Sequence, residues 1–351
     1  MSRSAVLLLV SIVTLFLLVD GFSFSLVPAL AYVKRSLRSV DNLSQLITCN
    51  KMLVSQQPGR HPEFVTCLMT AVASKDMHHY DPGKRLPLPG FVKLGNRQFR
   101  AIPIAETKIA VKLSHLSYLD KHSKEFTLGH FKELPTVVES PALAQTRAHV
   151  WTDAKSRTAF VSFRGTSSWM DVMHDLDTRP VPADPLLRPN ASIHAGFRLK
   201  FFSVKKQLED LLIHEKGKFD KIIITGHSLG GALATIAAPF LAELFPHKSI
   251  KCISFGAPRV GNDHFVEWFR EKVQLSVRIV NEHDPVPHLP LGLPFHHVSD
   301  GLCIVSDSDV YGFPEMPVGR RIAWAMEHLD LAQVKPSHDL LTYIDRVNMY
   351  N

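Results

Sequence analysis

The pattern of apolar and polar residues predicts short buried strands, each of which ends in a loop of glycine or polar residues. Residues 158–163, 222–225 and 276–280 are short runs that are rich in aromatic or β-branched residues, which is typical of strands. Residues 229–245 are rich in alanine and leucine and predict a helix, and a terminal amphipathic helix is expected after Pro336. Because parallel sheets carry their functional side chains at the carboxyl ends of strands, the loops after these strands hold the candidate residues.

Residues 226–231, Gly-His-Ser-Leu-Gly-Gly, lie at the junction of the predicted strand 222–225 and the predicted helix. This G-x-S-x-G pattern is typical of an elbow, in which a strand stops in a tight turn, exposes a serine and continues as a helix. Glycine is needed on both sides because a Cβ would obstruct the approach of the helix to the strand. Ser228 is therefore the predicted nucleophile, and the N–H of Leu229 would face a developing oxyanion.

A serine hydroxyl needs a histidine to accept its proton and a carboxylate to orient that histidine. In folds with this elbow both partners follow the serine in the chain. Asp284 is the predicted carboxylate, because its loop leaves the strand 276–280 and is restricted by Pro285 and Pro287. The competing acids lie in polar loops that do not follow an obvious predicted strand: Asp263, Asp300, Asp307 and Asp309.

His338 is the predicted base. It lies in a short loop after Pro336 and directly before the terminal amphipathic helix, where the last partner of an elbow serine is expected. His297 is the main rival and stands at the start of a predicted strand. A strand histidine of this kind is more often a structural group, so His338 is preferred.

The second oxyanion donor is expected in the loop after the strand 158–163. Gly165 lets the backbone turn toward the elbow there, and the N–H of Thr166 would then point at the oxyanion. The Thr166 hydroxyl is a further possible donor. Without the rest of the site, residues 164–166 would be read as a plain turn with a surface ion pair.

Together these residues resemble the class 3 lipase family, the fungal-type triacylglycerol lipases with their plant phospholipase and diacylglycerol lipase relatives. The matching segments are 163–166 (Phe-Arg-Gly-Thr), 194–197 (His-Ala-Gly-Phe), 226–231, 255–262 (Phe-Gly-Ala-Pro-Arg-Val-Gly-Asn), the Asp284 loop and the His338 segment. The resemblance covers about residues 106 to 347 and implies an α/β-hydrolase fold, with a mostly parallel central sheet and helices on both faces. It also implies carboxylic-ester hydrolysis by Ser228, Asp284 and His338, with Thr166 and Leu229 as oxyanion donors.

The resemblance also suggests a lid directly after Thr166. Trp169, Val172, Met173 and Leu176 fall at helical spacing with acids on the opposite face, which predicts a short amphipathic helix. As a lid, this helix would cover an apolar groove in water and turn its apolar face to a lipid surface. The other interpretation, in which the stripe packs into the core, remains open.

The amino-terminal segment predicts entry into the secretory pathway. Residues 5–19 are fifteen uncharged and mostly apolar residues, and residues 29–31 (Ala-Leu-Ala) form a cleavage site after which the chain would begin at Tyr32. Residues 1–31 are thus a predicted signal peptide, with an uncleaved signal anchor as the alternative. The sequons at Asn42 and Asn190 agree with secretion. Cys49 and Cys67 are close enough in sequence for a disulfide, whereas Cys252 and Cys303 resemble buried strand thiols.

Two further regions follow the signal peptide. Residues 32–105 predict a small helical extension that ends in a proline-rich connector, and it would be a pro-segment, a clamp or a membrane contact. Residues 106–351 have the size of a single α/β catalytic domain. Without residues 1–31 the chain has 39 basic and 32 acidic residues, a net charge of +7. This mild excess suits anionic lipid headgroups, and no basic cluster dense enough for nucleic acid is present.

The expected activity is hydrolysis of acylglycerols at a membrane or droplet interface, through an acyl-enzyme. We expect neither a cofactor nor a bound metal, because the sequence has no glycine-rich phosphate loop and no metal-ligand cluster. A phospholipase A1 or a non-lipid carboxylesterase of the same family is the alternative. An inactive lipid-binding protein is a minor alternative, and it would predict a missing triad member or a broken elbow.

Replacing Trp169 by serine tests the lid interpretation. We expect Trp169→Ser to reduce hydrolysis of an emulsified ester more than hydrolysis of a dissolved short-chain ester, because only the emulsion requires the lid to contact lipid. Initial rates on the two substrates measure the effect. An equal loss on both would favour the core-packing interpretation.

Overall fold

In the structure, a computed structural model, the described residues all belong to one unit of the chain, which has the bounds 86–316 and 336–351. The described residues are 92–93, 103–119, 131, 134–140, 145–166, 177–281, 283–290, 294–304, 310–313, 315 and 337–349. The predicted signal peptide, the four lid positions, Asn42, Cys49 and Cys67 lie outside the described residues. So does the extension 32–105, apart from residues 92–93 and 103–105.

The centre of the unit is a nine-stranded sheet of described strands in the order β1-β11-β10-β9-β8-β7-β4-β3-β2. Its strands are β1 Val92–Lys93, β2 Thr136–Ser140, β3 Thr146–Asp153, β4 Thr158–Phe163, β7 Lys221–His227, β8 Ser249–Phe255, β9 Leu275–Ile279, β10 Gly301–Ile304 and β11 Val310–Phe313. The strands from β4 through β7, β8 and β9 to β10 pair in parallel, and the pairs outside them are antiparallel. The predicted mostly parallel sheet is therefore confirmed. A separate antiparallel hairpin is formed by β5 (Pro180–Asp184) and β6 (Arg188–His194).

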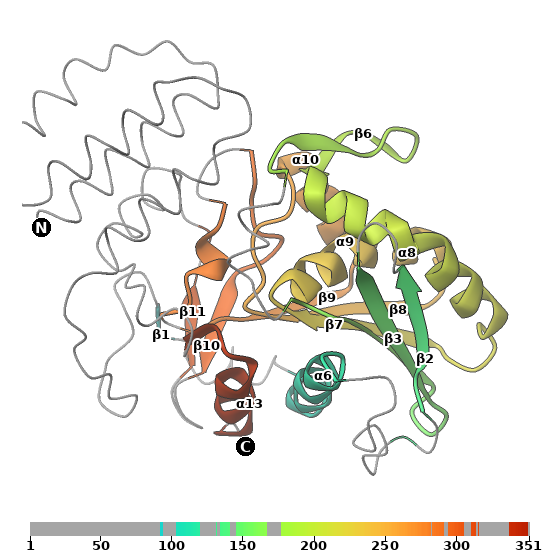
Figure 1. The fold of residues 1–351 in the computed structure, drawn as a ribbon, viewed down its shortest axis with the longest axis horizontal. Coiled ribbons are helices and arrows are strands. Elements are labelled where there is room, and N and C mark those ends of the chain that lie inside the picture. The colour runs from blue at the N-terminus through green and yellow to red at the C-terminus, as the bar shows by residue number, and fades with distance from the viewer. Residues whose placement is uncertain are drawn as a thin grey trace, which may run out of the picture. The chain divides into compact units, whose positions relative to one another are not determined.

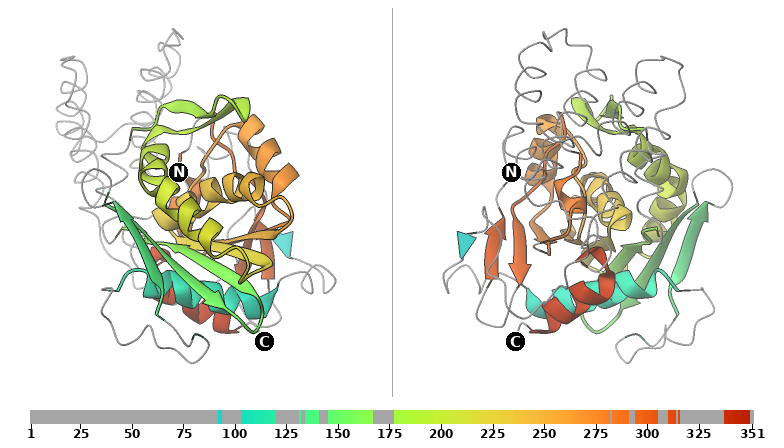
Figure 2. Two further views of the ribbon diagram at one scale, coloured as in Figure 1. Left: turned by 90° about the vertical axis from the view of Figure 1, so that its right-hand side faces the viewer. Right: turned by 60° about the vertical axis from the view of Figure 1, so that its left-hand side comes forward.

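Helices cover both faces of the sheet, as Figures 1 and 2 show. The helices are α6 Ile104–Leu116, α8 Ala195–His214, α9 Leu229–Leu244, α10 Asp263–Lys272, the 3₁₀ turn η2 Val286–His288 and α13 Leu340–Met349. α8, α9 and α10 lie on one face, while α6 and α13 lie side by side on the other. None of the described helices has the length and apolar character required to cross a bilayer.

The strand β7 shows why the sequence folds into these layers. Ile222 and Ile224 pack into the core beneath α8, α9 and α10, whereas Ile223 packs into the second core with α6 and α13. Successive side chains of a strand point to opposite faces, so a strand covered on both sides must be apolar throughout. This explains the unbroken apolar run that predicts the strand from sequence.

The predicted strands and the helix after the elbow are confirmed with small shifts at their ends. The run 158–163 is β4, the run 222–225 is the centre of β7, and 276–280 is β9 displaced by one residue. The helix predicted over 229–245 is α9. Cys252 in β8 and Cys303 in β10 are buried strand residues, as expected.

The first turn of α9 lies unusually close to the end of β4. A Cβ on Gly230 would stand 2.2 Å from the carbonyl oxygen of Phe163, a distance that no side-chain carbon tolerates. A Cβ on Gly226 would in turn meet the backbone of Gly230 at 2.3 Å. The two glycines therefore let helix, elbow and neighbouring strand pack together at backbone distance.

Replacing Gly230 by alanine should destabilise the fold. Because the obstructing atom is backbone, the helix must move, and overpacking of this kind typically costs about 1–3 kcal/mol. The free energy of unfolding in urea measures the effect. Gly217→Ala is the matched control, since its Cβ would have no atom within 4 Å. Equal stability of the two variants would contradict the close-packing explanation.

Candidate active site

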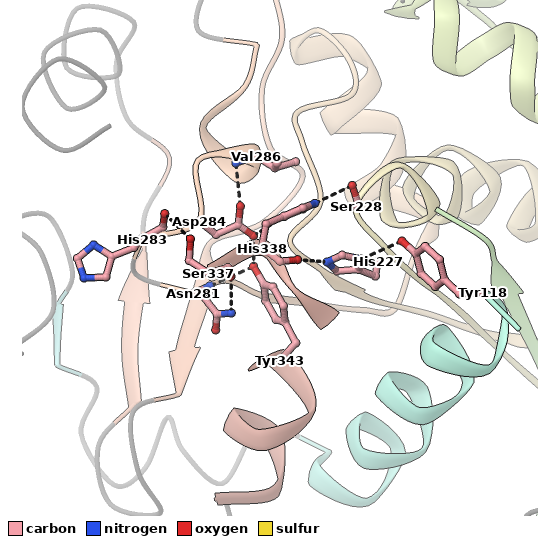
Figure 3. A network of polar contacts seen from close by, with 10 residues as sticks. All are labelled: Tyr118, His227, Ser228, Asn281, His283, Asp284, Val286, Ser337, His338 and Tyr343. Atoms are coloured by element: carbon pink, nitrogen blue, oxygen red, sulfur yellow. Dashed lines mark hydrogen bonds and ion pairs between the residues drawn. The ribbon is translucent and has the colours of Figure 1, made fainter. Parts of the chain in front are cut away.

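The serine of the elbow occupies a strained backbone position between β7 and α9. Ser228 has φ +58° and ψ −128°, a conformation that residues with a Cβ rarely adopt. Its N–H donates to the carbonyl of Phe255 at the end of β8, at 2.9 Å. The strain fixes the hydroxyl at the carboxyl edge of the sheet, where Figure 3 shows it facing the imidazole of His338.

Three residues that are far apart in the sequence meet at this point. The Nε2 of His338 lies 2.8 Å from the Oγ of Ser228, and its Nδ1 lies 2.8 Å from the Oδ2 of Asp284. All three side chains are buried. An ionised carboxylate can only accept, so the proton of His338 sits on Nδ1 and Nε2 accepts the serine O–H. The arrangement can therefore take a proton from Ser228.

The carboxylate of Asp284 is held by donors besides His338. Its Oδ1 accepts the N–H of Val286 at 2.9 Å, and its Oδ2 accepts the hydroxyl of Tyr343 from α13. Burial and the neighbouring Asp284 raise the pKa of Tyr343 well above its usual range, so this hydroxyl stays protonated and remains a donor. The acid is thus fixed from the η2 turn on one side and from α13 on the other.

A second histidine supports His338 from behind. The Nε2 of His227 donates to the main-chain carbonyl of His338 at 2.8 Å, and the hydroxyl of Tyr118 lies 2.9 Å from the Nδ1 of His227. Burial and the neighbouring His338 hold the pKa of His227 well below its usual range, so the ring is neutral. With its proton on Nε2, Nδ1 accepts from Tyr118, and this pairing fixes the tautomer.

Asn281 ties the acid loop to the segment that carries His338. Its N–H donates to the hydroxyl of Tyr343 at 3.2 Å, and its side-chain amide donates to the carbonyl of Ser337 at 2.8 Å. The hydroxyl of Ser337 returns a hydrogen bond to the carbonyl of His283 at 2.9 Å. These hydrogen bonds join the loop before η2 to the segment before α13 (Figure 3).

The two predicted oxyanion donors lie on either side of the elbow. The N–H of Leu229 belongs to the first turn of α9, whose N–H groups have no acceptor within the helix. Thr166 follows β4, and its Oγ1 is buried without a hydrogen-bond partner among the described residues. A Cβ on Gly165 would lie 2.6 Å from the carbonyl oxygen of His227, so this loop packs directly on the elbow. Both positions are thus close to Ser228.

The structure separates the rival residues from this site. The Nε2 of His297 donates to the carbonyl of Pro287 at 2.6 Å, and burial together with Arg278 and Arg259 lowers its pKa far below the usual range. The strand predicted to start at His297 is absent from the described residues there, where an isolated bridge joins His296 to Gly261.

The competing acids that the structure describes lie at the surface. Asp263 is an exposed residue in the first turn of α10, and Asp300 is an exposed loop residue. Asp307 and Asp309 are outside the described residues. Of the two sequons, Asn190 is exposed on β6.

Tyr118, His227, Asn281 and Tyr343 belong to this site, but sequence reasoning did not single them out. His227 lies inside the elbow pattern, where only its serine neighbour carries an obvious signal. Tyr343 lies on α13, shortly after His338. Its contact with Asp284 joins residues that are far apart in the sequence, so the sequence alone does not indicate it. Tyr118 lies in the turn that follows α6, a segment with no chemical motif.

His194, from a segment that carries the family resemblance, is a buried neutral histidine. It ends β6 and stacks on Phe197, with ring centroids 4.1 Å apart, and it also contacts the ring of Phe295. Burial lowers the pKa of His194 to about 4, although the charge of Asp177 opposes the shift. The ring therefore acts as an aromatic packing group at neutral pH.

Comparison with known proteins connects this geometry to lipases. Residues 160–293 match the family described as Lipase (class 3). The chain is 35% identical over 159 residues to phospholipase A1-II 1 of Oryza sativa subsp. indica, a match that covers 38% of this chain and 40% of that protein. It is 32% identical over 146 residues to secreted mono- and diacylglycerol lipase 1 of Fusarium solani, covering 41% and 42%. The chain thus spans about 40% of the length of these curated relatives.

A solved structure supports the same assignment. The native propeptide complex of Rhizomucor miehei lipase superposes with a TM-score of 0.52 at 26% identity. The superposition covers 67% of this chain and 78% of that one. The expected resemblance in fold, a mostly parallel sheet with helices on both faces, is therefore confirmed.

The buried histidine His194 should make the fold less stable in acid. Its pKa is about 4 in the folded chain and near 6.5 when exposed, so the unfolded chain binds the proton first. The contribution of the neutral ring to the free energy of unfolding is fully present above pH 6.5, the pKa of an exposed histidine. About 3 kcal/mol of that contribution is lost as the pH falls toward 4. Urea unfolding across this range should show a shallower loss for His194→Gln than for the native chain.

His264→Gln is the control for this comparison, because His264 is exposed on α10. Its variant should keep the full pH dependence. Identical pH profiles for the two variants would contradict the assignment of His194 as a buried neutral group.

Proposed function

The chain belongs to the class 3 lipase family, and on that premise we propose that it hydrolyses the ester bonds of acylglycerols with Ser228 as nucleophile. The observation that carries the proposal is the position of His338 between Ser228 and Asp284, with both hydrogen bonds at 2.8 Å. A weak hydroxyl nucleophile becomes reactive when a base accepts its proton and a carboxylate fixes that base. The three side chains are buried and joined by hydrogen bonds, which supports this role.

In the acylation step, Ser228 Oγ attacks the ester carbonyl as its proton passes to Nε2 of His338. Asp284 stabilises the resulting imidazolium and does not itself take the proton. The N–H groups of Leu229 and Thr166 would stabilise the tetrahedral oxyanion, with the Thr166 hydroxyl as an additional donor. Collapse of the intermediate expels the glycerol oxygen, which takes the proton back from His338 and leaves Ser228 acylated.

In the second half-reaction, His338 takes a proton from water, which attacks the acyl-enzyme. A second tetrahedral intermediate then collapses, the fatty acid leaves, and Ser228 regains its proton. The neutral His227 and the protonated Tyr343 support this cycle, because both hold the site through hydrogen bonds without exchanging protons at neutral pH.

The substrate proposed is an acylglycerol presented at a membrane or droplet surface. The Fusarium relative, which is named as a mono- and diacylglycerol lipase, supports this choice. Phospholipase A1 activity is the second candidate, favoured by the name of the rice relative. An inactive lipid-binding protein is disfavoured, because such a protein would have no need of an intact Ser228–His338–Asp284 arrangement.

We also propose that the protein is secreted or enters the endomembrane lumen. The apolar segment 5–19, followed by the cleavage site at 29–31, supports a signal peptide, and the name of the Fusarium relative supports secretion. In that compartment Asn42 and Asn190 would be glycosylation sites, and Asn190 is exposed on β6.

Substitution of Ser228 tests the proposal. Ser228→Ala should lower turnover by on the order of a millionfold while the folding stability stays intact, because the hydroxyl acts only in the chemistry. Initial rates are measured on a dissolved short-chain ester, a triacylglycerol emulsion and phosphatidylcholine vesicles. A modest loss of turnover on all three substrates would contradict the assignment of Ser228 as nucleophile. Serine-dependent activity that is highest on the vesicles would instead identify a phospholipase.

The two histidines provide a matched control. His338→Ala should abolish formation of the acyl-enzyme, which burst kinetics with a chromogenic ester detects. His297→Ala removes a buried ring as well, but one that donates to Pro287 away from Ser228. Equal loss of the burst in both variants would mean that the base has been misassigned.

A further inference from the structure

The hairpin of β5 and β6 carries an apolar tip that is exposed to solvent. Leu186 and Leu187, in the turn between the strands, are 94% and 46% exposed. The other exposed apolar positions of the hairpin are all prolines: Pro180, Pro182, Pro185 and Pro189. Single exposed leucines are common on protein surfaces, but adjacent leucines surrounded by exposed prolines form a patch that calls for a partner.

The tip is held in place rather than loosely attached. The Oδ1 of Asp184 accepts the N–H groups of Leu186 at 2.9 Å and of Leu187 at 3.0 Å, which closes the turn. At the base, the side chain of Asn262 accepts the N–H of Ser192 at 3.0 Å and donates to the carbonyl of Asn190 at 2.9 Å. The leucines are therefore presented in a fixed position, and little conformational entropy is lost when they are buried.

The hairpin rises from the same edge of the sheet as the active site. Its Ile193 bridges to Gly261, and the N–H of His194 donates to the carbonyl of Val260 at 3.0 Å. Gly261 and Val260 follow the carboxyl end of β8, next to the end of β7 where Ser228 stands. Figure 1 shows the hairpin at the top of the unit beside α10, with its turn extending beyond the helices.

Charged groups lie directly behind the apolar tip of the hairpin. Arg188 stands opposite Asp184 in the strand register and forms an ion pair with Glu271 of α10. Farther back, Arg179 pairs with Asp177 at 2.6 Å. The hairpin is therefore apolar at its turn and charged at the adjacent strand residues. A lipid surface has the same order, with apolar acyl chains inside and polar headgroups outside.

We propose that the tip of the β5–β6 hairpin inserts into the surface of an acyl lipid and anchors the sheet edge that carries Ser228. The choice of a lipid surface as the partner rests on the proposed function, because an enzyme that draws acylglycerols from such a surface must bring this edge to it. A projecting turn also suits a fluid surface, which requires no matching shape. The anchor acts independently of any movement after Thr166.

A glycan on Asn190, the glycosylation site proposed above, would limit the depth of insertion. A strand rises about 3.3 Å per residue, so Asn190 lies roughly 10 Å behind Leu187 along β6. A glycan on Asn190 would therefore stay at the headgroup level while the leucines enter the acyl region. Insertion is limited to the turn itself.

The first test measures binding with the Ser228→Ala protein, so that no lipid is consumed. Flotation with triolein droplets coated with phosphatidylcholine gives the bound fraction of the purified secreted protein. Adding Leu186→Ser and Leu187→Ser should lower the partition constant at least about tenfold, since burial of even one leucine changes a partition constant by roughly that factor. Leu341→Ser with Met349→Ser is the matched control, because these residues are 54% and 47% exposed on α13. It should leave binding within about twofold.

The second test reports the depth of the tip directly. Because the chain has four tryptophans of its own, each variant is compared with the parent protein. Leu186→Trp should add a blue-shifted emission that brominated phosphatidylcholine quenches when droplets are added, and Leu341→Trp should add neither. Equal partition of the two double variants, or an added emission that quenches no more in Leu186→Trp than in Leu341→Trp, would overturn the proposal.

The outcomes also separate this inference from the proposed function. If hydrolysis depends on Ser228 but the droplet partition constant is unchanged by the hairpin substitutions, the anchor is rejected and the proposed function is kept. Hairpin-dependent partition with no serine-dependent hydrolysis of any ester would reject the function and keep the lipid contact.

Discussion

The site depends on one close contact, in which the first turn of α9 lies against the end of β4. Gly230 takes part in this contact because a Cβ would collide with the carbonyl of Phe163. The contact brings Ser228, at φ +58°, to the carboxyl edge of the sheet, and places the loop of Thr166 beside it. If the helix stood farther away, the serine would leave this edge and neither oxyanion position would face it.

A polar scaffold of neutral groups completes the geometry around this contact. His227 and Tyr118 hold the main chain of His338 from behind, while Tyr343 and Val286 hold the carboxylate of Asp284. The pKa shifts of His227 and Tyr343, both caused mainly by burial, keep these two rings uncharged. A buried scaffold without charges of its own can fix the orientation of His338 without competing for its proton.

Sequence reasoning predicted the strands and proposed the three residues that meet at Ser228, because each has a local signal. The elbow has a fixed pattern of glycines, and Asp284 and His338 follow a strand and precede a helix in the expected chain order. The strand expected at His297 was wrong, because apolar residues near that position pack as a loop around a single bridge. The supporting residues were not found, since their partners lie up to 111 positions away.

The sequence by itself determined the layers of the fold and the position of the elbow that suggests the class of chemistry, because backbone strain, glycine spacing and apolar periodicity act between near neighbours. Only the tertiary structure decided which histidine meets Ser228, which side chains hold it, and that a pair of leucines stands exposed at the sheet edge that carries the site. Those facts depend on contacts between segments that the chain brings together from far apart. Burial, which selects the protonation state of His227 and the exposure of Leu186, exists only once these segments have packed.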